Sequence, residues 1–362
     1  MSSHLTCVLT TIQPPTASVH QLARALAAHD ADLIVIGDKK GPAHFDLPAA
    51  RFYSLADQTT LHFALAKLLP IGHYTRKNLG YLLAIANRAT CIYETDDDNA
   101  PLDRWTPRSR QITAHAVGGD GWFNVYDHFG SRISDRELLM ETQSSISNSP
   151  SAIGTGQLWP RGFPLDLLRN PASTDRERLG PLATLDAPIQ QGLADGSPDV
   201  DAVWRLILDR DVRFDSGAPS LVLSAGAWCP FNSQSTWWFG PAHPLLYLPS
   251  RCTFRMTDIW RSLIAQRCLW EIGAGVAFHG PEVFQERNPH DLMRDFADEV
   301  PGYLQNDQIR KRLEAVSLVP GEGNVGANLL RCYEALIEAK FFPGEERELV
   351  QAWVKDVETL TQ

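Results

Sequence analysis

The sequence lacks any run of about 18 or more apolar residues, the length that a transmembrane helix requires. Its first residues, MSSHLTCVLTTIQPP, contain no basic segment followed by a long apolar stretch, so no secretory leader is expected. Cysteine is sparse, and the six that occur form no C-x-x-C pair, which argues against a zinc site or a disulfide framework. We therefore expect a cytoplasmic protein with reduced thiols and no transmembrane segment.

An excess of positive charge is also missing. The chain carries 33 Lys and Arg against 43 Asp and Glu, a formal charge of -10, so we expect no nucleic acid partner. The negative net charge does not exclude small anionic ligands, because an acidic protein can contain a local basic pocket. The apolar fraction of 44% is typical of globular proteins, and 362 residues suffice for one large domain or two ordinary ones.

The first hundred residues alternate between strand-like and helix-like segments. Short β-branched or apolar runs predict strands, and apolar residues at helical spacing predict helices. The strands are expected over residues 5–12, 32–37 and 89–94, and the helices over 19–28 and 76–88. This alternation indicates an α/β fold with a parallel sheet, in which ligands bind at the carboxyl ends of the strands.

The chain after Gly118 is less regular. We expect an exposed loop around residues 170–198 and a return to regular structure beyond it. The later elements are predicted over 200–208, 220–225, 258–273 and 276–280, with two closing helices over 324–340 and 344–360.

Three consecutive aspartates, Asp96, Asp97 and Asp98, follow the third predicted strand directly and precede Asn99. Adjacent carboxylates repel one another, so this position needs a cation or hydrogen-bond donors. Magnesium and manganese prefer oxygen ligands and are commonly held by one or two carboxylates together with substrate phosphates. The cluster therefore predicts a divalent metal site. An acidic loop that caps the next segment is the alternative.

Other polar residues stand at the neighbouring strand ends. Asp38 follows the second strand, and Arg76, Lys77 and Asn78 open the helix before the acidic strand. Positive side chains at a helix start can bind phosphate with help from the helix dipole. An ordinary solvated charge pair is the alternative for Arg76 and Lys77.

The order of these features resembles GT-A glycosyltransferases: a first strand ending in Thr-Thr, an aspartate after the second, Arg-x-Asn-x-Gly, then Asp-x-Asp. The chain resembles more closely the STELLO-like family, known from plant Golgi proteins with a glycosyltransferase-like domain. The segments that carry this resemblance are TTIQPPT, VIGDKKGP, RKNLGYLLAI, IYETDDDN, NVYDHFG, LWPRGFPL, DIWRSLIAQRCLWEIG and QERNPHD. They span residues 10–295. We expect no membrane anchor like that of the plant members, so a Golgi location is not transferred.

The resemblance implies a GT-A type α/β fold, with a mixed, mostly parallel sheet flanked by helices. Its domain would cover residues 1–300, divided into a Rossmann-like nucleotide-sugar-binding half (1–118) and an acceptor half (119–300). A C-terminal helical extension would follow over 301–362.

The resemblance also assigns roles on the donor side. Thr10, Thr11 and Asp38 would contact the nucleoside, and Arg76, with Asn78 beside it, the base or the diphosphate. Asp96 and Asp97 would meet the sugar-phosphate. The metal, Mn2+ or Mg2+, would be held within Asp96 to Asp98; Asp96 and Asp98 are the ligands we expect, and which of the three aspartates touch the metal is left open. Apart from the resemblance, His279 is a candidate supplementary ligand.

Asp258 is the candidate general base. Sugar transfer with inversion needs a group that takes the proton of the acceptor hydroxyl, and an acid ahead of a helix is often placed for this in GT-A enzymes. Plain capping of that helix is the alternative. His290 is a second candidate metal ligand beside His279, and each is otherwise a hydrogen-bonded histidine. Arg161 and Arg255 are candidates to meet charges of the acceptor or of a phosphate, and they receive no firm role.

The expected function is a metal-dependent glycosyltransferase, inverting, with a UDP-sugar favoured as donor and a glycan or lipid-linked hydroxyl as acceptor. Peripheral contact with a membrane and a homo-oligomer are left open. The alternatives are a nucleotide-sugar mutase and a non-catalytic nucleotide-sugar-binding or assembly protein. The GEGNVG stretch at 321–326 matches a dinucleotide-binding pattern but lacks the following strand that the pattern requires.

Overall fold

The computed structural model describes residues 4–134, 158–169, 176–288 and 290–362. Its strands are β1 (Leu5–Thr11), β2 (Asp32–Gly37), β3 (Ala50–Tyr53), β4 (Cys91–Thr95), β5 (Asn99–Pro101), β6 (Gln111–Val117), β7 (Gly121–Trp122), β8 (Ser131–Ser134), β9 (Leu179–Asp186), β10 (Ile189–Gly196), β11 (Asp211–Phe214), β12 (Leu221–Leu223), β13 (Ala227–Trp228), β14 (Ser235–Phe239) and β15 (Val276–Gln285). Its α-helices are α1 (Ala17–Ala27), α2 (Leu55–Thr59), α3 (Lys77–Ala86), α4 (Val125–Phe129), α5 (Ala202–Ile207), α6 (Thr257–Trp270), α7 (Leu292–Glu314), α8 (Val325–Glu338) and α9 (Glu346–Thr361).

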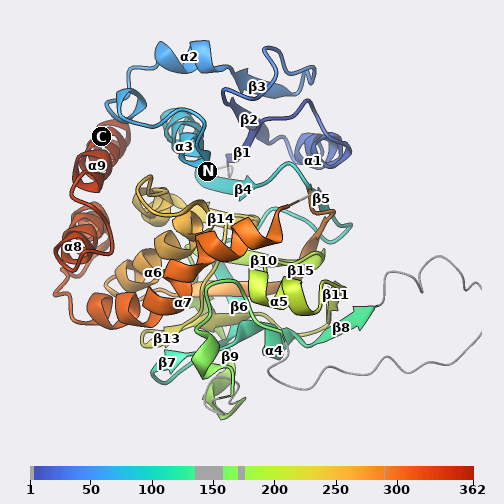
Figure 1. The fold of residues 1–362 in the computed structure, drawn as a ribbon, viewed down its shortest axis with the longest axis vertical. Coiled ribbons are helices and arrows are strands. Elements are labelled where there is room, and N and C mark those ends of the chain that lie inside the picture. The colour runs from blue at the N-terminus through green and yellow to red at the C-terminus, as the bar shows by residue number, and fades with distance from the viewer. Residues whose placement is uncertain (1–3, 135–157, 170–175, 289) are drawn as a thin grey trace, which may run out of the picture.

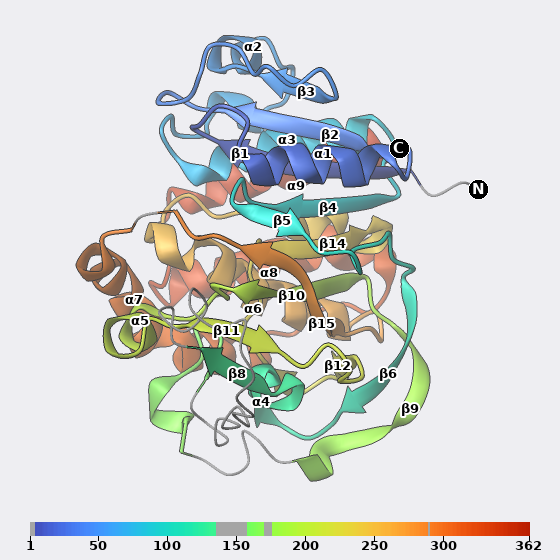
Figure 2. The same cartoon turned by 90° about the vertical axis from the view of Figure 1, so that its right-hand side faces the viewer.

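One large mixed sheet organises the described residues, in the order β3-β2-β1-β4-β14-β10-β15-β12-β6-β9. Figure 2 shows these strands stacked from β3 at one end to β6 and β9 at the other. The N-terminal strands β3, β2, β1 and β4 run parallel, and β14 is inserted antiparallel between β4 and β10. The predicted α/β class is confirmed, and the architecture is consistent with the GT-A type.

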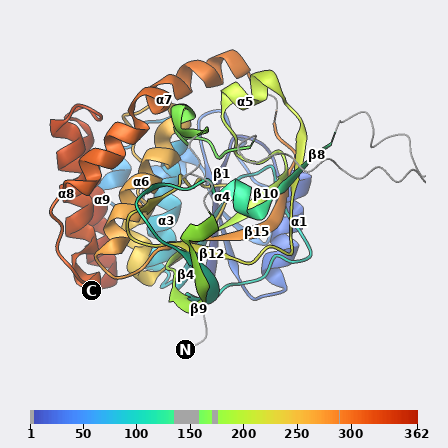
Figure 3. The ribbon, with the colours of Figure 1, turned by 90° about the horizontal axis from the view of Figure 1, so that it is seen from below.

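Each face of the sheet has its own hydrophobic core because side chains alternate along a strand. On β1, Cys7 and Leu9 pack with α1 on one face, while Val8 joins the larger core on the other. That larger core includes residues of α3, α6, α8 and α9. Figure 3 shows α1 alone on its side of the N-terminal strands, with these four helices on the opposite side (Figure 1 gives the front view).

Helix α3 lies unusually close to the parallel strands because Gly80 faces them. A Cβ at this position would lie 2.5 Å from Cγ1 of Val8 and 3.0 Å from Cγ1 of Ile36, so a side chain would force the helix away. The glycine of the Arg-x-Asn-x-Gly pattern is therefore explained by packing.

A buried ion pair fastens α6 to the sheet. Nη2 and Nη1 of Arg261 lie 2.7 and 3.0 Å from the Glu94 carboxylate, and the two side chains are 1% and 0% exposed. Glu94 also accepts hydrogen bonds from Tyr81 and from Nε1 of Trp238, and the guanidinium of Arg261 stacks 4.8 Å from the Trp238 ring. The pair therefore joins β4, α3, β14 and α6 at one point.

Several expectations for the second half of the chain need correction. The segment 170–198, expected as an exposed loop, contains β9 and the fully buried β10 in its described part. Helix α7 was not predicted, and it crosses the expected domain boundary at residue 300. The GEGNVG stretch is followed only by α8 and α9, so the dinucleotide-binding alternative is wrong.

The thiols are free, as expected, at all six cysteines. No helix in the described part of the chain has both the length and the apolar character to cross a bilayer.

We predict that Glu94→Gln lowers the free energy of unfolding by about 3–5 kcal/mol, since the Arg261 guanidinium would stay buried without its counter-charge. Chemical denaturation measures this. Glu334→Gln is the matched control, because it breaks an exposed pair with Arg347 and should change stability little. Equal effects of the two substitutions would contradict the role given to the Glu94–Arg261 pair.

Candidate functional site

The carboxyl ends of β1, β2 and β4 open into a cavity of about 720 Å³. Of the residues singled out by the sequence, the cavity lining includes Thr10, Thr11, Asp38, Asp96, Asp97, Asp98 and Asp258. Arg76, Asn78 and His279 are absent from it. The structure thus brings together most of the predicted donor-side residues and the candidate base.

The strand register explains how the acidic loop meets β1. Val8 of β1 pairs with Glu94 of β4. Three residues further along each strand, this register places Thr11 beside Asp97. Oγ1 of Thr11 donates a hydrogen bond to Oδ2 of Asp97, and Oγ1 of Thr16 donates to the Asp97 carbonyl oxygen. These two hydroxyls hold the loop in place.

Lys77 contacts the acidic loop, whereas the predicted Arg76 and Asn78 do not. Nζ of Lys77, which is fully buried, lies 3.1 Å from Oδ1 of Asp96 and 2.8 Å from the Thr95 carbonyl oxygen. Arg76 instead donates to Gln58 and to the Leu69 carbonyl.

Asn78 is also structural. Its side chain donates to the carbonyl oxygen of Leu248 and accepts from that residue's N–H, both at 2.9 Å. Ligand-binding roles for Arg76 and Asn78 are therefore corrected to packing roles, because their polar atoms are used inside the fold.

Asp38 shapes the neighbouring wall of the cavity. Its carboxylate accepts hydrogen bonds from the backbone N–H groups of Gly72 and His73, both at 2.8 Å. Next to it, Oγ1 of Thr10 donates to the Ile36 carbonyl at 2.8 Å. Asp38 and Thr10 line the cavity while they also order the loops around it.

Asp98, unlike Asp96, pairs with no cation among the described residues. Burial, together with the nearby carboxylates of Asp96 and Asp97, raises the pKa of Asp98 to about 7. Its Oδ2 accepts from Nε2 of Gln285 at 3.0 Å, but no cation pairs with it among the described residues. Burial also raises the pKa of Asp96, although Lys77 opposes that shift.

The donor set suits a hard divalent cation held only partly by the protein. Among the described residues, no group of three His, Cys, Asp or Glu side chains is arranged to hold a metal ion alone. Magnesium in phosphate-processing sites needs only one or two carboxylates, and substrate phosphates and water supply the rest. The uncompensated, half-buried carboxylate of Asp98 meets that requirement.

His279 is not placed to be a metal ligand. It is 5% exposed, and its ring nitrogens lie 3.0 Å from Oε1 of Gln190 and 2.7 Å from Oγ of Ser220. Burial lowers the pKa of His279 well below its ordinary value, so the ring is neutral and hydrogen-bonded inside the sheet. His290 lines the cavity instead, where Nδ1 lies 3.0 Å from Oδ2 of Asp295.

Asp258 stands in the first turn of α6 and is held by an arginine. Nη1 and Nη2 of Arg161 lie 3.0 and 2.9 Å from its two carboxylate oxygens, and the Ser233 N–H and hydroxyl both lie 3.3 Å from Oδ2. Burial alone would raise the pKa of Asp258, but Arg161 holds it below its ordinary value. The side chain does not cap the helix, because the capping residue is Met256, which makes no side-chain cap bond.

A chain of hydrogen bonds links the acidic loop to Asp258. Oη of Tyr74 lies 3.1 Å from Oδ1 of Asp96 and 2.5 Å from Oγ of Ser233, which in turn contacts Asp258. Sequence reasoning missed Tyr74 and Ser233, since an isolated Tyr and Ser carry no pattern. The two sides of the cavity are thus connected directly.

The segment after β15 closes the acidic side. Gln285 contacts Asp98, and Nδ2 of Asn288 lies 3.4 Å from Oδ1 of Asp97. These residues belong to the QERNPHD segment, which the sequence singled out without giving them a role. Pro289 lies outside the described residues.

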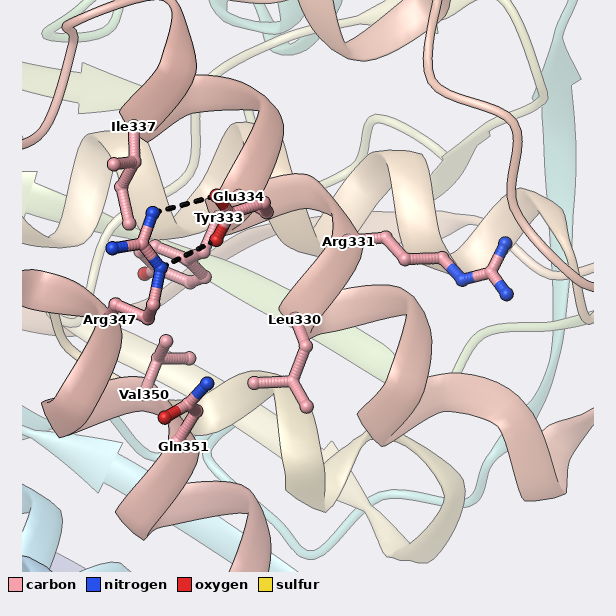
Figure 4. A pocket seen from close by; sticks show the side chains of 8 residues that line it. All are labelled: Leu330, Arg331, Tyr333, Glu334, Ile337, Arg347, Val350 and Gln351. Atoms are coloured by element: carbon pink, nitrogen blue, oxygen red, sulfur yellow. Dashed lines mark hydrogen bonds and ion pairs between the residues drawn. The ribbon is translucent and has the colours of Figure 1, made fainter. Parts of the chain in front are cut away.

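A second cavity, of about 230 Å³, lies between α8 and α9. Figure 4 shows the side chains that line it, which include Leu330, Ile337 and Val350 and the ion pair between Arg347 and Glu334. It contains no cluster of reactive groups, so we assign the chemistry to the larger cavity.

Comparison with known proteins confirms the predicted resemblance. Residues 255–362 match the family model of STELLO glycosyltransferases. Two Arabidopsis thaliana proteins are similar: "Probable glycosyltransferase STELLO2" is 26% identical over 90% of this chain, and "Probable glycosyltransferase STELLO1" is 29% identical over 69% of it. The aligned parts are 41% and 31% of those proteins, so the chain spans less than half of their length.

A solved structure described as "Crystal Structure of a Mycobacterial Protein" is also similar, with a TM-score of 0.37 and 10% identity over 84% of this chain and 75% of that one. A likeness of this size carries no argument about function.

We predict that Asp98→Asn raises the thermal midpoint of the metal-free protein at pH 8 by about 2–4 °C, because it removes a half-buried charge that repels Asp96 and Asp97. Differential scanning calorimetry in the presence of a chelator measures this. Asp103→Asn, at an exposed position after the same loop, is the control and should leave the midpoint unchanged. A lowered midpoint for Asp98→Asn would contradict the electrostatic account.

Proposed function

We propose, from the premise that this chain is a relative of the STELLO glycosyltransferases, that it transfers a sugar from a nucleotide-sugar donor to an acceptor hydroxyl with help from a divalent metal. The observation that carries the proposal is the juxtaposition of the acidic loop and Asp258 in one cavity, joined through Tyr74 and Ser233.

The donor would lie along the carboxyl ends of the parallel strands. Thr10, Thr11, Asp38 and the Gly72–His73 turn would face the nucleoside, with a UDP-sugar as the favoured donor. Asp98 and Asp96 would hold Mn2+ or Mg2+ beside the diphosphate. The metal would neutralise the diphosphate as it leaves. Because Lys77 already pairs with Asp96, Asp98 is the principal metal ligand in this proposal.

Asp258 would act on the acceptor. The acceptor oxygen attacks the anomeric carbon, the bond from that carbon to the diphosphate oxygen breaks, and the hydroxyl proton passes to the Asp258 carboxylate. Because Arg161 lowers the pKa of Asp258, the carboxylate is ionised at neutral pH and can accept a proton, but it is a weak base. Attack from the side opposite the diphosphate inverts the configuration of the sugar.

Two matched substitutions test the proposal. Asp98→Asn should weaken manganese-dependent UDP binding by about tenfold or more, since it removes the charged metal ligand. Asp258→Asn should leave that binding intact and lower turnover of the UDP-sugar by a factor of about 10²–10⁴, the size of a general-base contribution. Calorimetric titration measures the binding, and release of UDP measures turnover.

The products separate this function from its alternatives. A UDP-sugar isomer without UDP release would identify a mutase, and UDP binding with no conversion would identify a non-catalytic binding protein. Failure of the wild-type chain to bind UDP with manganese would overturn the proposal as a whole.

A further inference from the structure

Beyond Asp258, the same cavity is lined by arginines that the proposed function does not use. Arg205 comes from α5, Arg255 precedes α6, and Arg287 and Arg294 flank the start of α7. We call these four residues the arginine wall. Arg161 is excluded because it is committed to Asp258.

Arg205 is a buried cation with weak compensation. Its side chain is 4% exposed, and its ion-pair partner Asp209 lies 3.8 Å away and is itself 54% exposed. Nη2 donates to the Pro198 carbonyl at 2.6 Å, whereas Nε has no hydrogen-bond partner in the part of the chain that the structure describes. Burial, with a contribution from Arg287, lowers the pKa of Arg205 to about 10.

Two other members of the wall, Arg255 and Arg287, lie close enough for their positive charges to repel each other. Burial lowers the pKa of Arg287, and the positive charge of Arg255 lowers it further. Arg294 is exposed at the cavity. Like charges on one partly desolvated concave surface are costly unless an anion joins them.

Carboxylates around the wall compensate it in part. Asp295 lies 2.7 Å from Nη2 of Arg287, and Glu299 lies 2.8 Å from Nε of Arg255. Asp199 shares Oδ1 between Arg161 and Arg255, at 2.8 and 3.9 Å. Asp291 and Asp298 also line the cavity. Among the described residues, none of these carboxylates forms an ion pair within 4 Å of Arg205. A bound anion would therefore interact most favourably with Arg205.

We propose that the arginine wall binds a phosphate group carried by the acceptor. This inference rests on the proposed glycosyl transfer and adds the substrate class to it. Guanidinium groups match phosphate oxygens in bidentate geometry, and several of them around one point suit a dianion better than a single carboxylate. The wall would hold the acceptor by its phosphate so that its hydroxyl lies beside Asp258.

The donor diphosphate is a poorer occupant of this wall. In the proposed function the diphosphate lies with the metal at Asp96 and Asp98, and Asp96 is linked to Asp258 through Tyr74 and Ser233. Arg161 and Asp199 connect Asp258 to Arg255, whereas Arg287 belongs to the segment whose Gln285 and Asn288 contact the acidic loop. The arginine wall thus shares one cavity with Asp258 and the acidic loop, so the donor and acceptor sites would be adjacent.

The phosphate can belong to a soluble sugar phosphate or to a lipid. Phe254 lines the cavity and is 52% exposed, and Met293, next to Arg294, is 64% exposed. Exposed apolar side chains beside basic ones suit a lipid-borne phosphate. The test therefore includes a probe of each kind.

The first measurement is calorimetric titration with inorganic phosphate in the absence of metal. Arg205→Gln and Arg287→Gln should each weaken phosphate binding by about tenfold or more, the loss expected for one charged hydrogen-bonding group. Arg287→Lys should recover part of it. Arg24→Gln, at an exposed position on α1, is the control and should bind as the wild type does. Each variant's thermal midpoint is measured to establish that it is folded.

The same variants are titrated with UDP and manganese, which should bind as they do to the wild type. Absence of phosphate binding in the wild type, or wild-type phosphate affinity in both Gln variants, would overturn the inference. Loss of manganese-dependent UDP binding in folded Gln variants would overturn it too, since the arginines would then serve the donor. Absence of UDP binding in the wild type, with phosphate binding retained, would count against the proposed function instead.

The probes that separate the two sources are glucose 1-phosphate and vesicles of phosphatidylcholine with phosphatidic acid. Binding of either that depends on Arg205 and Arg287 supports the inference and assigns the source. Binding of neither contradicts it.

Discussion

The Glu94–Arg261 ion pair is the constraint on which the geometry of the cavity depends. Glu94 lies two residues before Asp96 on β4, and Arg261 lies about one helical turn after Asp258 on α6. Joining these two residues therefore fixes Asp258 relative to the acidic loop. Tyr81 and Trp238 contact the pair, and its two side chains are 1% and 0% exposed, so its charges are shielded from water. Removal of one partner leaves the other charge buried without a counter-charge, and this lowers the free energy of unfolding by more than the intact pair contributes to it. The relative position of β4 and α6 is therefore strongly fixed.

Charge is then distributed around the cavity in a definite order. Among the described residues, Asp98 pairs with no cation, Asp258 pairs with Arg161, and Arg205 has the exposed Asp209, 3.8 Å away, as its ion-pair partner. Asp98 and Arg205 thus carry opposite charges in the lining of one cavity. This distribution suits a metal with a diphosphate beside Asp98 and an anionic acceptor beside Arg205.

The sequence placed the acidic loop and Asp38 at one sheet edge correctly because local patterns determine the N-terminal strands. Apolar runs gave β1, β2 and β4, and the parallel arrangement placed Asp38 and Asp96 to Asp98 at one sheet edge. The residue of α3 that meets the acidic loop depended on how the helix packs around Gly80, so the contact fell on Lys77 and not on Arg76 or Asn78. The central strand β10 was missed because Gln190, Gln191 and Asp195 interrupt its apolar pattern, although the sheet buries them.

His279 was misplaced because its partners, Gln190 and Ser220, are distant in sequence. The arginine wall likewise needed the fold, since its members come from separate segments.

In the proposed function, Asp98 holds a metal beside a nucleoside diphosphate. Anomalous diffraction from a crystal grown with manganese and UDP is the sharpest test of this role. We expect a manganese peak coordinated by the Asp98 carboxylate and by oxygens of the diphosphate, with Asp258 across the cavity from them. A manganese ion bound elsewhere, or UDP bound without contact to the 96–98 loop, would contradict it.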